Sequence, residues 1–127
     1  MSRWVLDASA ALAFLQRQPG REAVEEVLDA AAISTVNVAE VAARLAEGDF
    51  SGSEIRQTVE SLGTEVVDFD SGLAYRAAEL RRATKHAGLS LGDRACLATA
   101  QRLGAGVLTT DRSWAGLEVG VEIRVIR

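Results

Sequence analysis

The alternation of short apolar runs with longer amphipathic segments is the feature that most constrains the fold of this chain. The short runs are rich in Val, Ile and Leu, and the segments between them repeat apolar residues three and four apart, as helices do. We expect strands at residues 4–6, 32–34, 65–68, 106–108 and 122–126. We expect helices at residues 21–31, 38–47, 53–62, 72–86 and 92–103, with a further helix that begins at residue 8.

Strands that are separated by helices need crossover connections, which place neighbouring strands in parallel and cover both faces of the sheet. The expected fold class is therefore α/β, a three-layer α/β/α sandwich with a mostly parallel central sheet. The length of 127 residues suffices for one packed core, and we treat residues 1–127 as a single domain. In the last helix, Leu97, Ala100 and Leu103 are expected to form a buried stripe.

Composition narrows the class of protein. The net charge of -4 argues against a purely electrostatic nucleic-acid binder, but an acidic metal site is compatible with it. Cys96 is the single cysteine, so disulfide frameworks and cysteine-rich zinc sites are excluded, and we interpret it as a small buried hydrophobe. The first residues lack the long apolar stretch of a signal peptide or a membrane span, and we expect a cytoplasmic protein.

Four acidic residues occupy similar places in the predicted fold. Asp7 and Asp111 follow predicted strands, whereas Glu40 and Asp93 lie in the first turns of predicted helices. In a parallel sheet the strand ends and the following helix starts share one edge, where ligands bind. Two carboxylates about 4 Å apart repel by roughly 4 kcal/mol at an effective dielectric near 20, and a divalent cation removes that cost. Oxygen ligands favour Mg²⁺ or Mn²⁺.

Each acid also has an explanation that needs no metal. Asp7 can cap the helix that begins at residue 8, and Asp111 can open a turn. The other two acids complete capping-box patterns, Asn37-Val-Ala-Glu40 and Ser90-Leu-Gly-Asp93. Only the occurrence of all four acids at one edge favours the metal site.

Four stretches of the chain, each containing one of these acids, closely resemble PIN domains, and within that family the VapC toxins of bacterial toxin-antitoxin pairs. They are VLDASAAL at residues 5–12, STVNVAEV at 34–41, SLGDRACLA at 90–98 and VLTTDRSW at 107–114. Their order and spacing extend the resemblance over nearly the whole chain. The resemblance implies an endoribonuclease in which Asp7, Glu40, Asp93 and Asp111 bind Mg²⁺ or Mn²⁺ and support hydrolysis of RNA phosphodiesters.

The resemblance also implies that Ser9 and Thr110 line the site as hydroxyl donors and that Asn37 lies close by. It implies two protein partners: a cognate antitoxin, whose C-terminal segment covers the acidic groove, and a second copy of the chain. We hypothesise that the surface of this homodimer comes from the helices between residues 38 and 62.

The basic residues and the lone histidine have several interpretations. Arg44, Arg94 and Arg112 lie closest to the acids in sequence and can hold phosphates or pair with carboxylates, and Glu40 with Arg44 can form a surface pair one helical turn apart. A further basic group ends the helix at 72–86, and we interpret it as solvated; its members are Arg81, Arg82, Lys85 and His86.

Other functions remain open. A non-catalytic PIN-like module that acts through a protein partner would use the acids only as helix caps. A metal-dependent phosphatase of the haloacid-dehalogenase type would need a second acid two residues after Asp7, where this chain has Ser9. A structure-specific DNA nuclease would need extra DNA-gripping elements, for which a chain this short has little room.

Overall fold

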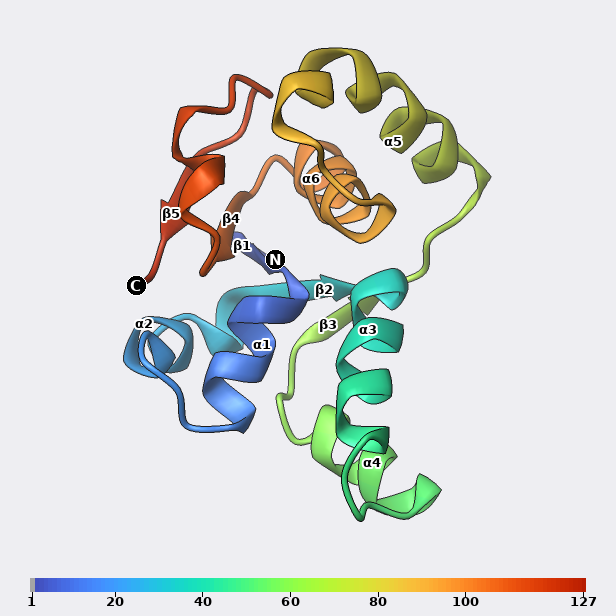
Figure 1. The fold of residues 1–127 in the computed structure, drawn as a ribbon, viewed down its shortest axis with the longest axis vertical. Helices are drawn as coiled ribbons and strands as arrows, with labels where there is room; N and C mark the ends of the chain where they lie inside the picture. Colours follow the sequence, from blue (N-terminus) through green and yellow to red (C-terminus); the bar gives the residue numbers. More distant parts are fainter. Residues whose placement is uncertain (1) are drawn as a thin grey trace.

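The computed structural model describes residues 2–127, and over these residues five parallel strands form one sheet in the order β3-β2-β1-β4-β5 (Figure 1). The strands are β1 (Trp4–Leu6), β2 (Ala31–Ser34), β3 (Glu65–Val67), β4 (Gly106–Thr109) and β5 (Ile123–Val125). The predicted parallel sheet is confirmed, and each strand end lies within one residue of its predicted position.

Helices cover both faces of this sheet (Figure 1). One face carries α1 (Ala8–Leu15), α2 (Arg21–Glu25), α3 (Thr35–Ala46) and α4 (Gly52–Glu60), and the other carries α5 (Ser71–Thr84) and α6 (Leu91–Leu103). Three short 3-10 turns are η1 (Leu28–Ala30), η2 (Lys85–Ala87) and η3 (Arg112–Gly116). The predicted three-layer α/β/α sandwich is confirmed. Within the part of the chain that the structure describes, no helix is both long and apolar enough to cross a bilayer.

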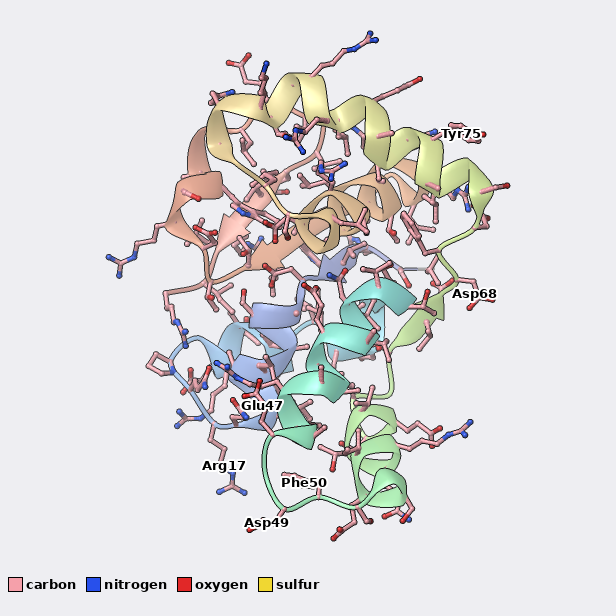
Figure 2. The ribbon with its side chains drawn as sticks, turned by 45° about the vertical axis from the view of Figure 1, so that its right-hand side comes forward. Arg17, Glu47, Asp49, Phe50, Asp68 and Tyr75 are labelled. Atoms are coloured by element: carbon pink, nitrogen blue, oxygen red, sulfur yellow. The ribbon has the colours of Figure 1, made fainter. Side chains whose placement is uncertain are left out.

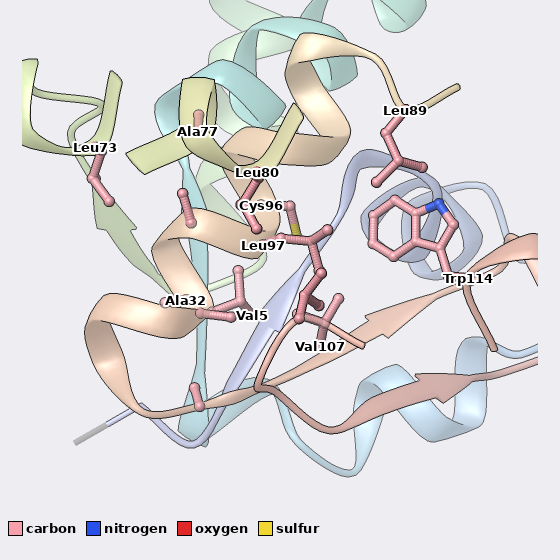
Figure 3. Packing of buried hydrophobic residues seen from close by; sticks show 14 residues of the cluster. Val5, Ala32, Leu73, Ala77, Leu80, Leu89, Cys96, Leu97, Val107 and Trp114 are labelled. Carbon is pink, nitrogen blue, oxygen red and sulfur yellow. The ribbon is translucent and has the colours of Figure 1, made fainter. Parts of the chain in front are cut away.

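The core consists of two hydrophobic clusters, one on each side of the sheet, because successive strand residues point to opposite faces. Val5 of β1 belongs to the cluster beneath α5 and α6, which also contains the fully buried Trp114 and Cys96 (Figure 3). Leu6, the next residue, belongs to the cluster beneath α1 and α3. The interpretation of Cys96 as a buried hydrophobe is confirmed.

The helix boundaries differ from the sequence prediction in one region. The helix predicted at residues 21–31 ends at Glu25, and after a 3-10 turn Ala31 already belongs to β2. The helix predicted from residue 38 begins at Thr35, because Ser34 caps it by accepting a hydrogen bond from the Val36 amide at 3.2 Å. Alanines at 30–32 suit both helix and strand, so apolar spacing alone did not separate the two elements.

The remaining predicted features of the helices agree with the structure. In α6, Leu97 and Ala100 are fully buried and Leu103 packs half-buried against the same cluster, which confirms the predicted stripe. The basic residues at the end of α5 and in η2 are exposed, as predicted for a solvated helix end; they are Arg81, Arg82, Lys85 and His86.

Candidate active site

Asp7 is the most tightly held of the four acids. It follows β1 and caps α1: its Oδ1 accepts hydrogen bonds from the Ala10 amide at 2.8 Å and from the Ser9 hydroxyl at 2.7 Å. Its Oδ2 accepts a hydrogen bond from the Thr109 hydroxyl at 2.5 Å. The residue is only 5% exposed. These contacts fix the carboxylate in one orientation at the carboxyl edge of the sheet.

The electrostatic environment of Asp7 opposes its ionisation. Burial raises its pKa to about 6, the hydrogen bonds from Thr109, Ser9 and Ala10 lower it, and the charge of Asp93 raises it further. Within residues 2–127, no Arg, Lys or His nitrogen lies within 4.0 Å of this carboxylate. Asp7 is therefore a buried acid without a protein cation.

Asp93 forms the predicted capping box at the start of α6. The Ser90 hydroxyl accepts a hydrogen bond from the Asp93 amide at 3.2 Å, and Asp93 Oδ2 accepts one from the Ser90 amide at 3.0 Å. Asp93 is half-buried, and its Oδ1 receives no hydrogen bond from the described residues. One oxygen of this carboxylate thus supports the helix while the other is available to a ligand.

Glu40 reaches the site from α3 because Gly92 leaves room for it. A Cβ atom at Gly92 would lie 2.4 Å from Glu40 Oε1. Asn37 holds the pair together, since its Nδ2 donates to Glu40 Oε1 at 2.8 Å and to the Gly92 carbonyl at 3.0 Å. The Glu40 carboxylate therefore lies over the first turn of α6, against Gly92.

The alternative explanation of Asn37-Val-Ala-Glu40 as a capping box is wrong, and Glu40 lies in the second turn of α3, not in the first turn as predicted. Helix α3 begins two residues earlier than Asn37, so this side chain lies inside the helix, where it is 1% exposed. Because the amide group donates to both Glu40 and Gly92, it positions an acid and joins two helices. Its Oδ1 is buried and has no hydrogen-bond partner among the described residues.

Asp111 lies at the exposed margin of the site. It caps η3, as predicted for a turn, with its Oδ1 accepting from the Ser113 amide at 2.9 Å and the Ser113 hydroxyl at 2.7 Å. Its own amide donates to the Thr109 hydroxyl oxygen at 3.0 Å, which links it to Asp7. The neighbouring Arg112 is exposed, and its Nε donates to the Arg127 carbonyl at 3.1 Å.

The hydroxyl groups around Asp7 differ from those indicated by sequence. Ser9 does reach Asp7, and its oxygen also accepts a hydrogen bond from the Thr110 amide at 3.0 Å. Thr110 thus contributes its backbone, whereas the hydroxyl that reaches Asp7 belongs to Thr109, which sequence reasoning missed. The strand register could have identified it, because Leu6 pairs with Leu108 and the next residues therefore face each other.

Two arginines that the sequence placed near the acids have other partners. Arg44 Nη1 lies 3.8 Å from Glu47 Oε2, and Arg44 does not pair with Glu40. The surface pair between Glu40 and Arg44 that we expected from their sequence spacing is therefore wrong. Arg94 points toward α5, where its Nη1 donates to the Ala77 carbonyl at 3.0 Å. Neither guanidinium group neutralises the acids.

The donor set fits a hard divalent cation. Burial, followed by the charges of Asp7, Asp93 and Glu40, raises the pKa of the Cys96 thiol well above its ordinary range, so all three carboxylates act on this one point in the core. As they lie, no three acidic, histidine or cysteine groups among residues 2–127 are close enough to share one ion. Mg²⁺ commonly takes one or two protein carboxylates and fills its other positions with water, so a magnesium site does not require three carboxylates at one point.

The sequence of the chain matches a known protein family. The family model described as PIN domain matches residues 4–119. The chain matches none of the curated proteins with which it was compared.

Several solved structures share the fold. DNA-bound VapBC from Salmonella typhimurium is 21% identical, with 98% of both chains covered and a TM-score of 0.76. VapBC2 from Rickettsia felis, bound to a fragment of its promoter DNA, is 16% identical over 95% of this chain and 96% of that one, with a TM-score of 0.74. VapBC-5 from Mycobacterium tuberculosis is 25% identical over 100% of this chain and 99% of that one, with a TM-score of 0.66.

Proposed function

The chain belongs to the PIN-domain family, and on that premise we propose that it is a metal-dependent endoribonuclease that acts as the toxin of a toxin-antitoxin pair. The buried Asp7 carboxylate carries the proposal. It is fixed by three hydrogen bonds, it lies at the ligand-binding edge of a parallel sheet, and no described cation neutralises it. A divalent cation would supply the missing positive charge.

In this proposal Asp7 and Asp93 would hold Mg²⁺ or Mn²⁺, with Glu40 and Asp111 at the margins of the site. Such a cation would lower the pKa of a bound water and would stabilise the charge that develops on the phosphodiester oxygens. The other residues prepare the site: Thr109 and Ser9 orient the Asp7 carboxylate, and Asn37 keeps Glu40 over α6.

The test is cleavage of single-stranded RNA by the purified protein with Mn²⁺ or Mg²⁺, with and without EDTA. We expect metal-dependent cleavage that Asp7→Asn abolishes. Asp70→Asn is the matched control, because Asp70 also caps a helix but lies at the start of α5 and is paired with Arg102. Equal RNase activity in Asp7→Asn and the unmodified protein would show that the activity comes from a contaminant or from another site.

A non-catalytic module is the second candidate, and one observation favours it. Three of the four acids, Asp7, Asp93 and Asp111, already have structural roles at helix starts, and no three of the described acids converge on a single point within metal-binding distance. Titration with Mn²⁺ separates the two functions, because a ligand that binds only the folded state raises the Tm. A Tm that is unchanged at millimolar Mn²⁺, together with absence of RNA cleavage, would favour the module.

We further propose an antitoxin as protein partner. The support is that the similar structures from Salmonella, Rickettsia and Mycobacterium are VapBC assemblies. The acidic edge around Asp7, Glu40 and Asp93 would attract a basic segment of such a partner, which would compete with the cation. Co-purification of the neighbouring gene product, and loss of RNA cleavage when it is added, are the expected results.

For the homodimer, α3 and α4 remain the proposed surface. A groove of about 440 Å³ runs between these helices and the sheet edge, with a mainly apolar lining that includes Val38, Ile55, Val59 and Val66. Val66 of the edge strand β3 is 53% exposed. Sedimentation of the purified protein at micromolar concentration should give a dimer, and Val66→Glu should give a monomer.

A further inference from the structure

Two arginines beside the acidic site, Arg112 and Arg127, are linked by contacts to each other and to the turn that contains a third arginine, Arg17. Arg112 follows Asp111 and donates to the Arg127 carbonyl at 3.1 Å. Arg127 in turn donates to the Gln18 side chain at 3.4 Å and to the Pro19 carbonyl at 3.3 Å. Gln18 directly follows Arg17 in the turn after α1. We call Arg112, Arg127 and Arg17 the arginine row.

The arginine row begins at the acidic site. Strand β5 lies beside β4, and the Ile126 amide donates to the Thr109 carbonyl at 2.9 Å, so residues 126–127 leave the sheet next to the threonine that contacts Asp7. Ile126 also packs against Gly20, because a Cβ at Gly20 would lie 2.9 Å from Ile126. From the acids the row therefore crosses the end of β5 and reaches the turn between α1 and α2.

Among the described residues, no Asp or Glu side chain neutralises the charges of the row. All three arginine side chains are exposed, and none has an Asp or Glu carboxylate within 4.0 Å. The polar contacts of Arg112 and Arg127 are with the Arg127 main-chain oxygen, Gln18 and Pro19. Arg21, which lies close by and donates to the Arg17 carbonyl, differs because it lies 3.6 Å from Glu22. Figure 2 shows Arg17 extending away from the body of the molecule beyond the end of α1. The row thus presents three exposed guanidinium groups, none of which is paired with a described Asp or Glu side chain.

Arg17 has a backbone conformation that glycine adopts more easily than arginine. Its φ is 54°, and among the described residues it is the one non-glycine with a positive φ. It ends α1 in a left-handed conformation, with the Gln18 amide donating to the Ala13 carbonyl at 2.8 Å. Glycine is the favoured residue in this position, and an L side chain there costs roughly 1 kcal/mol. Such strain is found at functional positions.

We propose that the arginine row binds backbone phosphates of the RNA strand next to the cleaved bond, an inference that rests on the proposed ribonuclease function. Guanidinium groups pair with phosphate oxygens through two parallel hydrogen bonds. The whole chain carries a net charge of -4 and repels RNA, so a local positive surface must offset that repulsion. An acidic protein segment has similar chemistry, but the row adjoins the acids where the phosphodiester would lie, which favours RNA.

The test measures KM and kcat for a single-stranded RNA of mixed sequence in the unmodified protein and in Arg17→Gly, Arg112→Gln and Arg127→Gln. We expect KM to rise about three- to tenfold for each variant while kcat changes little, because phosphate contacts position the strand. The double variant Arg17→Gly with Arg127→Gln should also reduce the dependence of log KM on log salt by about 0.7 for each lost contact.

Two controls separate charge from folding. Arg17→Gly should retain or raise the Tm, because glycine suits the backbone at this position. Arg76→Gln removes an exposed arginine of α5 that, like the row, has no Asp or Glu carboxylate within 4.0 Å among the described residues, and it should leave KM unchanged. Unchanged KM and salt dependence in all row variants would overturn the proposal, as would equal increases in Arg76→Gln.

Direct binding keeps this proposal distinguishable from the ribonuclease function. A fluorescent RNA oligonucleotide is titrated into Asp7→Asn and into Asp7→Asn combined with the row variants. Weaker binding in the combined variants supports the row even where the unmodified protein cleaves no RNA, in which case only the proposed function fails. If the row variants leave RNA binding intact but weaken binding of a poly-glutamate peptide, the row is a site for an acidic protein segment and the proposal is wrong.

Discussion

Asp7 and Asp70 have the same local structure and opposite electrostatic environments. Each follows an extended residue and caps a helix with its Oδ1, which accepts a hydrogen bond from the amide three residues on, at 2.8 Å for Asp7 and 2.9 Å for Asp70. Asp70 is exposed, and Arg102 of α6 donates to both of its oxygens at 2.8 and 2.9 Å. Asp7 is buried and has no such partner among the described residues.

The pKa values express this difference. The hydrogen bonds from Arg102 are the largest cause that lowers the pKa of Asp70 to about 2, whereas burial raises that of Asp7 to about 6. Relative to the ordinary value of 3.8, the ionised Asp7 costs about 3 kcal/mol of folding free energy at neutral pH. A cap therefore does not distinguish a structural acid from a functional one, but the compensation of its charge does.

Among the variants considered, Asp7→Asn should have the largest effect on activity, because it removes the buried charge that distinguishes Asp7 from Asp70. Asparagine can still cap α1, but it removes the buried charge, so we expect the metal-free protein to gain about 1 to 2 kcal/mol of stability while RNA cleavage falls at least about 100-fold. Urea unfolding in EDTA and a cleavage assay with Mn²⁺ measure the two effects. A less stable but active Asp7→Asn would mean that this carboxylate is structural, like that of Asp70.

Gly92→Ala should expel one acid from the site with little effect on the fold. The new Cβ would meet the end of the flexible Glu40 side chain, which can move into solvent, and alanine suits helix α6 better than glycine. We expect an unchanged or slightly higher Tm and about a tenfold loss of RNA cleavage. Glu40→Gln is the matched variant. If Gly92→Ala is fully active, Glu40 does not contribute to the reaction.

Thr109→Val should increase the contrast between the two aspartates. It deprives Asp7 Oδ2 of its hydrogen bond and the Asp111 amide of its acceptor, and we expect a loss of about 1 to 2 kcal/mol of stability. Thr109→Ser keeps the hydroxyl and should lose less. Denaturant unfolding of both variants measures the difference. A larger loss in Thr109→Ser than in Thr109→Val would show that packing of the Thr109 methyl group matters more here than its hydrogen bonds.

The smallest expected effect is a pair of opposite pH dependences in the metal-free protein. Because the folded pKa of Asp7 is raised, folding loses stability as the pH rises from about 4 to 6, and Asp7→Asn should lose this decline. Because the folded pKa of Asp70 is lowered, its contribution is present above about pH 4 and is lost as the pH falls through about 2.

Thermal unfolding in EDTA from pH 2 to 8 measures the pH dependence of stability that each of the two aspartates causes. The difference in Tm between the unmodified protein and Asp70→Asn should vanish at the acid end, whereas the difference from Asp7→Asn should be largest above pH 6. The same sign of pH dependence in both variants would contradict the comparison.

Sequence reasoning succeeded where the information is local. Apolar spacing gave the parallel α/β fold, and residue type after a strand gave the caps at Asp7 and Asp111. It failed where a role depends on a partner distant in the chain. Thr109 bonds Asp7 across 102 residues of sequence, and Asn37 bonds Gly92 across 55. Arg102 likewise finds Asp70 through the packing of α5 on α6, which apolar spacing predicts as a contact but not as an ion pair.

The bond from Asn37 to the Gly92 carbonyl has a consequence for motion. It joins α3, which packs in one core cluster, to α6, which packs in the other, at the edge where the acids lie. A cation held by Asp7, which precedes α1, and Asp93 of α6 would add a second link across the same boundary. Local opening of either half would then require release of the ligand, so amide hydrogen exchange should slow along the whole of α3 and α6, well beyond the residues that touch the ligand.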